Sequence, residues 1–236
     1  MTIMNFDDFD VWWRERSDDA QLSQMRAWLE NELQLPPYSA RSAIEYSILW
    51  RLARWHHFAA MKCADNITVA REYFASGARH AKRARASHQR IGHSTLEADF
   101  WHVVNALEAA RLKNQLATLC VLPNATKALT NVLRCDEEFH FAGALRVLGR
   151  MTHLKPNFLG GGARKSLSWF QDALHFAPQN STTRLYYAEA LRDANEIESA
   201  RYQLEMLISQ PLDDEWRWEQ ARDKIIAARL LKEPRA

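Results

Sequence analysis

The spacing of apolar residues restricts this chain to a helical architecture. Leu96, Phe100, Val103 and Leu107 are four, three and four residues apart, which places them on one face of a helix with 3.6 residues per turn. The 236 residues include only seven Gly and seven Pro, so little turn chemistry is left for a multi-stranded sheet. We therefore expect an all-α fold in which successive helices are joined by short breaks.

A longer pattern indicates that these helices pair as hairpins. Ser166, Phe170, Ala173 and Pro178 are spaced as a small residue, a large one, a second small one and a terminating proline, the order found in TPR repeats. Small residues let two helices approach closely, and the aromatic ring fills the space towards the next hairpin. Other partial matches to this spacing are Ala70–Phe74–Gly77 and Ala200–Leu204–Leu207–Pro211. The chain is thus predicted to form TPR-like antiparallel helix hairpins, in a compact or short superhelical bundle.

One stretch carries a more specific set of motifs. These are HFAGALRVLGR at 140–150, KPNFLGG at 155–161, ARKSLSWFQDAL at 163–174 and APQN at 177–180. The stretch resembles the T-component family of TRAP transporters, whose pattern has a G-A-x-R-x-L-G-R helix, a proline, a phenylalanine and a double glycine before a TPR-like hairpin. The resemblance is strongest from Ala98 to Pro211 and does not include residues 1–38. It implies an all-α TPR-like fold and a binding role as an accessory to solute uptake.

The prolines suggest how the chain is divided. Pro36 and Pro37 end the first pair of expected helices, because proline cannot donate to a continuing helix. We expect residues 1–38 to be an N-terminal helical extension and residues 39–236 to form one continuous TPR-like domain. A second break is expected at Pro123, before a short helix that ends near Cys135, and the next helix is expected to start at Asp136.

The N-terminus and the cysteines indicate the cellular compartment of the protein. Residues 1–9 contain two acids and no basic region followed by an apolar run, and no lipoprotein-type cysteine lies near the start. No stretch of about 18 uncharged apolar residues occurs. Cys63, Cys120 and Cys135 are odd in number and form no CxxC pair. We expect a cytoplasmic protein without a membrane span, with buried, reduced thiols.

No motif for catalysis or for a cofactor stands out. HExxH, GxSxG and GxGxxG are absent, and the segment from Gly160 to Ser166 lacks the glycine that a phosphate-binding loop needs directly before its lysine. His56 and His57 are adjacent, so they point to different faces of a helix. We therefore expect no enzyme activity, no cofactor and no metal site.

Two arginines lie on a helix that is otherwise nearly all apolar. Arg146 and Arg150 are four residues apart and share one face, and a buried cation must be paired or must face a cavity. One interpretation is internal ion pairs to an acid such as Glu108 or Glu137. The other is a cavity in which a guanidinium receives an anionic ligand or a partner's carboxylate. Internal pairing is favoured overall, and we expect one arginine of each kind.

Four further residues complete the candidate binding set. Trp101, Asn105 and Glu108 lie opposite the apolar stripe of their helix, and Tyr187 lies on the helix before Ala200. The polar and aromatic face around Trp101 has two equal interpretations, the lining of a concave groove or an ordinary helix surface.

A basic run is the last candidate site. The segment Arg79–Arg90 contains five Lys or Arg residues and no acid. The favoured interpretation is a solvated helix face near a helix C-terminus. The alternative is a patch that binds nucleic acid or an anionic surface. The whole chain has 31 basic and 29 acidic residues, a balance that does not favour nucleic acid.

The sequence therefore predicts a non-catalytic TPR-like binding or scaffold protein with a groove or cavity for a partner segment or a small anionic ligand. An accessory ligand-binding component of TRAP-type solute transport is the alternative, and binding through the Arg79–Arg90 run is the second alternative. A protein partner or a small anion is expected, and self-association into a homo-oligomer is compatible with the sequence.

Overall fold

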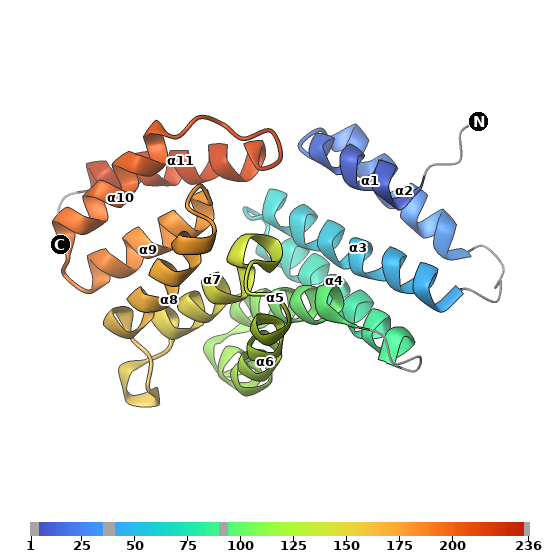
Figure 1. The fold of residues 1–236 in the computed structure, drawn as a ribbon, viewed down its shortest axis with the longest axis horizontal. Helices are drawn as coiled ribbons and strands as arrows, with labels where there is room; N and C mark the ends of the chain where they lie inside the picture. Colours follow the sequence, from blue (N-terminus) through green and yellow to red (C-terminus); the bar gives the residue numbers. More distant parts are fainter. Residues whose placement is uncertain (1–4, 35–40, 90–93, 234–236) are drawn as a thin grey trace. The chain divides into compact units, whose positions relative to one another are not determined.

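The computed structural model describes residues 5–34, 41–89 and 94–233, and the regular structure in these ranges is helical throughout (Figure 1). It comprises eleven α-helices and two short 3-10 helices, with no strand in the described ranges. The all-α prediction is confirmed. Pro36, Pro37 and Arg90 lie outside the described residues, so the expected division of the chain at residue 38 stays a prediction.

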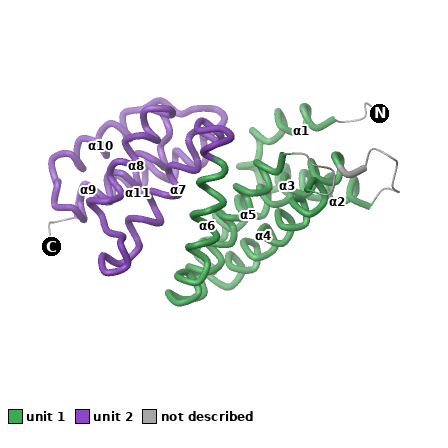
Figure 2. The backbone as a smooth tube through the Cα atoms, turned by 60° about the horizontal axis from the view of Figure 1, so that its bottom comes forward, with its two compact units in different colours: residues 1–132 green, residues 133–236 purple. Residues whose placement is uncertain are grey.

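The chain divides into two compact units, residues 1–132 and residues 133–236 (Figure 2). The helices of the first unit are α1 (Phe6–Trp12), η1 (Trp13–Glu15), α2 (Asp19–Gln34), α3 (Arg41–Lys62), α4 (Ile67–Gln89) and α5 (Leu96–Lys113). Helix α6 (Gln115–Cys135) begins in the first unit and ends in the second. The helices of the second unit are α7 (Phe139–Leu154), η2 (Asn157–Leu159), α8 (Ala163–Phe176), α9 (Ser181–Asp193), α10 (Ile197–Ser209) and α11 (Arg217–Lys232).

Unit 1 is built around the consecutive packing of α3, α4 and α5. The matched residues Ala70, Phe74 and Gly77 on α4 are all buried, as the repeat spacing predicts. A Cβ atom on Gly77 would lie 2.6 Å from Oδ1 of Asn105, which is closer than real side chains approach. A glycine at this position therefore lets α4 and α5 pack closely.

Helix α6 runs without a break through Pro123, so the break expected at this proline is wrong. Pro123 is exposed, and water can bond the one carbonyl that the missing N–H leaves unpaired. The buried residues Ala125, Leu129 and Val132 that follow keep helical spacing. Tertiary packing of this apolar face outweighs the local helix-breaking preference.

Unit 2 consists of the hairpins α7–α8 and α9–α10, followed by α11, which packs against α9 and α10 (Figure 1). Ser166, Phe170 and Ala173 on α8 are fully buried, and so are Ala200, Leu204 and Leu207 on α10. A Cβ on Gly149 would lie 2.8 Å from the ring of Phe170. The contacts that the repeat spacing predicts are therefore present, and the packing is consistent with TPR-like hairpins.

Within the described residues, no helix combines the length and the apolar character that a membrane crossing requires.

Candidate anion-binding site

Two helices of unit 2, α7 and α11, bring arginines to one aromatic side chain, Tyr186 on α9. The guanidinium of Arg150 on α7 lies 4.4 Å from the centre of the Tyr186 ring. Arg146, one turn earlier on α7, and Arg222 on α11 are both within electrostatic range of the Tyr186 phenol. We call Arg146, Arg150 and Arg222 the arginine cluster.

Arg150 is held by partners within the protein. Its Nη1 lies 2.6 Å from Oε2 of Glu189 on α9 and donates to Nδ1 of His153 over 3.2 Å. Because Arg150 can only donate, Nδ1 of His153 accepts, and Nε2 then carries the proton that bonds Asp193 over 2.8 Å. Internal pairing is thus the correct interpretation of Arg150, but its partner is Glu189, and the expected Glu108 and Glu137 are wrong.

Arg222 is likewise compensated. Oδ1 of Asp223 accepts from its Nε and Nη2, at 3.0 and 2.6 Å. Although burial acts to lower it, the pKa of Arg222 lies above its ordinary value because of the attraction of Asp223. The other oxygen of Asp223 accepts from Ser181 Oγ and Thr182 Oγ1. Asp223 is completely buried and both of its oxygens are engaged.

Arg146 differs from the other two members of the cluster. It is 9% exposed, and its Nη1 donates to the backbone oxygen of Phe141 over 3.0 Å. Among the described residues, no carboxylate lies within ion-pair distance of it. Burial lowers the pKa of Arg146 to about 10, and the distant attraction of Tyr186 and Asp223 only partly opposes this. Arg146 is thus a buried cation whose charge has no direct partner in the described chain.

The carbonyl that receives Arg146 belongs to an unusual turn. His140, Phe141 and Ala142 have φ values of 52°, 57° and 55°, a left-handed conformation that is costly for residues other than glycine. The rings of His140 and Phe141 pack against Trp216 at 5.3 and 4.9 Å. Regular right-handed helix therefore begins after Ala142, later than the start expected at Asp136.

Tyr187 does not belong to this cluster. It is 8% exposed, lies in the core with its ring 6.3 Å from that of Phe170, and accepts a hydrogen bond from Gln171. The aromatic residue of the site is its neighbour Tyr186, which sequence reasoning did not single out, along with Glu189, Arg222 and Asp223. The available signal was the three-residue spacing of Tyr186 and Glu189, which puts them on one helix face.

The prediction that the face around Trp101 is exposed is wrong. Trp101 is 5% exposed and Asn105 is fully buried, so neither lines an open groove or an outer surface. The amide of Asn105 donates to the backbone oxygens of Ala53 and Trp101, at 3.1 and 2.8 Å, and so links α3 to α5. Glu108 forms an ion pair with Arg111 over 2.7 Å. Binding roles for these residues stay predictions.

The basic run on α4 is partly neutralised by other helices. Arg83 pairs with Glu45 on α3, and Arg85 pairs with Asp99 on α5, each over 2.6 Å. These pairs agree better with a helix face tied into unit 1 than with a free cationic patch. In the described ranges no cluster of three or more His, Cys, Asp or Glu side chains is placed to hold a metal ion.

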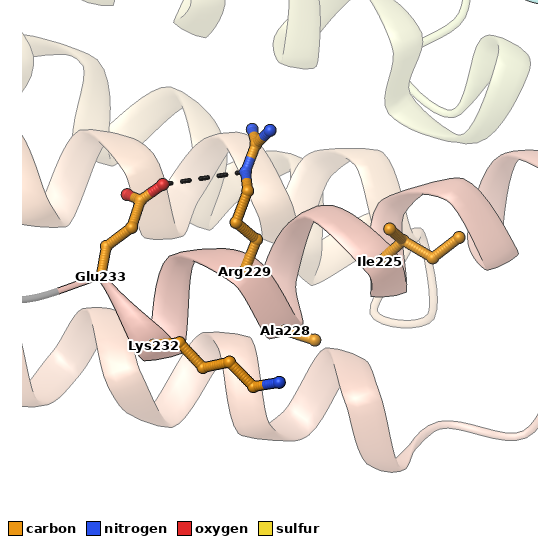
Figure 3. A pocket seen from close by; sticks show the side chains of 5 residues that line it. All are labelled: Ile225, Ala228, Arg229, Lys232 and Glu233. Atoms are coloured by element: carbon orange, nitrogen blue, oxygen red, sulfur yellow. Dashed lines mark ion pairs between the residues drawn. The ribbon is translucent and has the colours of Figure 1, made fainter.

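A hollow lies along α11 and differs in character from the arginine cluster (Figure 3). It has a volume of about 570 Å³, and its lining comes from one helix: Ile225, Ala228, Arg229, Lys232 and Glu233. Arg229 faces Glu233 over 3.7 Å, and Ile225 is 73% exposed. The acid of this hollow, Glu233, is already paired with Arg192 of α9 as well as with Arg229. The arginine cluster, which joins side chains from several helices, is therefore the better candidate site.

Comparison with known proteins agrees with this architecture. No curated protein matches the chain significantly. The model of the TRAP transporter T-component family matches residues 51–215, more than two thirds of the chain, from α3 to the residues just before α11. The chain therefore belongs to the TRAP transporter T-component family.

Proposed function

We propose that this protein is a non-catalytic binding component that receives a carboxylate on the face formed by α7, α9 and α11. The observation that supports this most is Arg146, which is 9% exposed and, among the described residues, bonds only the Phe141 carbonyl. A buried guanidinium without a counter-charge is costly. A carboxylate from outside the chain would offset that cost and would form charge-assisted hydrogen bonds.

The neighbours of Arg146 support its availability. Two acids form ion pairs with the cluster: Glu189 pairs with Arg150, and Asp223 pairs with Arg222. Neither acid needs to leave its partner for an anion to bind at Arg146. The site therefore discriminates by charge, since an incoming cation would find no unpaired acid there.

The family gives the biological setting of this proposal. As a T-component, the protein would act as an accessory to TRAP-type solute uptake, and the carboxylate would belong to a protein of that system. A small organic anion is the second candidate, because the same guanidinium chemistry recognises it.

Native mass spectrometry of protein purified from its own host tests the proposal. We expect the parent to retain a protein or a small anion that Arg146→Met loses. Arg201→Met is the matched control, because Arg201 is an exposed arginine of the same unit, paired with Glu205, and it should retain the ligand. Retention by Arg146→Met, or nothing retained by the parent, would contradict the proposal.

Cytoplasmic residence is a further part of the proposal. All three cysteines carry free thiols. Cys120 and Cys135 are exposed, so the expectation that all three thiols are buried is wrong. Exposed free thiols suit a reducing compartment. Cell fractionation with thiol labelling tests this, and recovery from the periplasm or in disulfide-linked form would refute it.

A further inference from the structure

A polar pocket in unit 1 lies between α2, α3 and α4. Its volume is about 270 Å³, somewhat below the range of about 300–1,000 Å³ for sites of drug-sized molecules. The residues that line it are Arg26, His56, Val69, Glu72, Tyr73 and Ser76. Five of these six side chains carry a polar group, so the pocket suits a small polar molecule.

His56 lines this pocket and carries an unused hydrogen-bonding atom. The residue is 5% exposed, and its buried Nδ1 has no hydrogen-bond partner among the described residues. Its ring stacks on His80 with centroids 5.0 Å apart and planes 14° from parallel. Buried polar atoms in proteins are nearly always bonded, so this atom points to a ligand that the chain itself does not provide.

At neutral pH the cations that act on His56 are Arg26 and Arg79, because burial also lowers the pKa of His80. Arg26 from α2 and Arg79 and His80 from α4 all act on its imidazole. Burial first, and then these neighbours, lower the pKa of His56 to about 3. The ring is therefore neutral at physiological pH and can present one N–H as a donor.

The remaining groups around the pocket define its outer part. Arg79 is anchored by a hydrogen bond to Ser76, and Arg26 is paired with Glu30 at the part-exposed surface. Glu30 also acts on His80. Glu72 is exposed at the wall. The buried His56 thus supplies a donor, the part-exposed Arg26 and the exposed Arg79 add positive potential, and the acids Glu30 and Glu72 lie towards solvent.

We propose that this pocket binds a small oxyanion, a carboxylate or a phosphate, through Nδ1–H of His56 and the guanidinium of Arg26. Ser76 supplies a further hydroxyl at the lining. The site is independent of the arginine cluster, because it is built only from helices of unit 1. The basic segment of α4 then has a local role, since Arg79 adds positive potential at one pocket.

The experiment follows the His56 imidazole signals by NMR during separate titrations with sodium acetate and with inorganic phosphate, at constant ionic strength and pH 7. We expect saturable shifts with at least one anion, and the two arms identify which one. The apparent pKa of His56 should rise in the bound state, because an anion favours the protonated ring. A melting curve of each variant confirms that it is folded.

Matched variants separate a built site from general attraction. Arg26→Gln should weaken binding by about tenfold or more. Lys82→Gln removes the same charge from an exposed position of α4 outside the pocket, and it should leave the affinity unchanged. Glu72→Gln should tighten binding, because it removes an acid from the wall.

Three results would overturn the proposal. One is a shift that does not saturate with either anion. Another is an equal loss in Lys82→Gln and Arg26→Gln, which would assign the effect to the whole basic face. The third is weaker anion binding in Glu72→Gln, because removal of a nearby acid cannot weaken a site that holds an oxyanion by positive potential.

Discussion

Each unit buries an arginine, and the two are compensated in different ways. In unit 1, burial lowers the pKa of Arg54 to about 10, and in unit 2 burial lowers that of Arg146 to the same value. Arg54 lies 2.6 Å from Asp10, which also pairs with Arg51. Within the described ranges, Arg146 bonds only a backbone carbonyl. A similar lowering of the pKa therefore accompanies an ion pair in one unit and, among the described residues, a charge without an acid partner in the other.

Aromatic rings reinforce the pairing in unit 1. Arg51 lies 4.2 Å from the ring centre of Trp50, and Arg54 lies 4.4 Å from that of Trp13. With Asp10, these contacts fasten α1 and η1 to α3. Arg51 and Arg54 thus serve the fold of unit 1, whereas the proposed function assigns Arg146 to binding.

The largest expected effect tests the packing that holds the face of unit 2. Gly149→Leu should cost about 3 kcal/mol or more, because even a Cβ would lie 2.8 Å from the buried ring of Phe170. Ser168→Leu, at an exposed position of α8, is the control and should change stability by less than about 0.5 kcal/mol. Chemical denaturation measures both, and an unchanged midpoint for Gly149→Leu would show that the α7–α8 register is wrong.

Acid should affect unit 1 through its buried histidines. Burial lowers the pKa of His56 to about 3 and also lowers those of His80 and His102. The unfolded chain, with histidine near 6.5, then binds protons more readily than the folded one, so stability falls as the pH drops below 6.5. His56 alone should cost about 2 kcal/mol at pH 5.

Hydrogen exchange at pH 7 and pH 5 measures this loss residue by residue. Amides of α3 and α4 should lose protection, and His56→Asn should reduce that loss. The control His175→Asn changes an exposed histidine of α8 and should have no such effect. Equal protection of α3 and α4 at both pH values would refute the prediction.

A smaller effect tests the ion pair of unit 1. Asp10→Asn leaves Arg51 and Arg54 without a counter-charge and should cost about 2 kcal/mol. This is less than the 3–5 kcal/mol of a fully buried pair, because the Asp10 side chain is 37% exposed. The control Asp7→Asn removes an exposed acid of the same helix. If both variants melt alike, the pair does not fasten α1.

The sequence predicted the packing better than it predicted the site. Phe170, Ala173 and Gly149 were identified because close helix contact demands particular sizes at fixed spacings. Arg146 and Arg150 were identified because charge on an apolar helix is conspicuous. Their partners could not be found in this way, since Glu189 and Asp223 lie on other helices, and an ion pair between helices has no fixed sequence spacing.

The errors have related physical causes. Trp101 and Asn105 were placed on an outer face because the spacing of Leu96, Phe100, Val103 and Leu107 suggested a single apolar stripe. Helix α5 is instead covered on more than one side, as α3 and α4 both pack against it. The prediction of Tyr187 is one residue away from the aromatic residue of the site, Tyr186. One residue along a helix turns the side chain by about 100°, so Tyr187 lies on the core side of α9 instead.

We infer above all that Arg146 has no charge partner among the residues that the structure describes, and thermal melting of Arg146→Met beside Arg150→Met tests this most directly. Arg150→Met leaves Glu189 unpaired and loses the Tyr186 contact, so it should cost about 1 kcal/mol in these partly exposed groups. Arg146→Met removes a buried, unpaired cation, and water can replace its bond to the carbonyl of the exposed Phe141. The account predicts that Arg146→Met melts at or above the parent temperature, and a fall as large as that of Arg150→Met would contradict it.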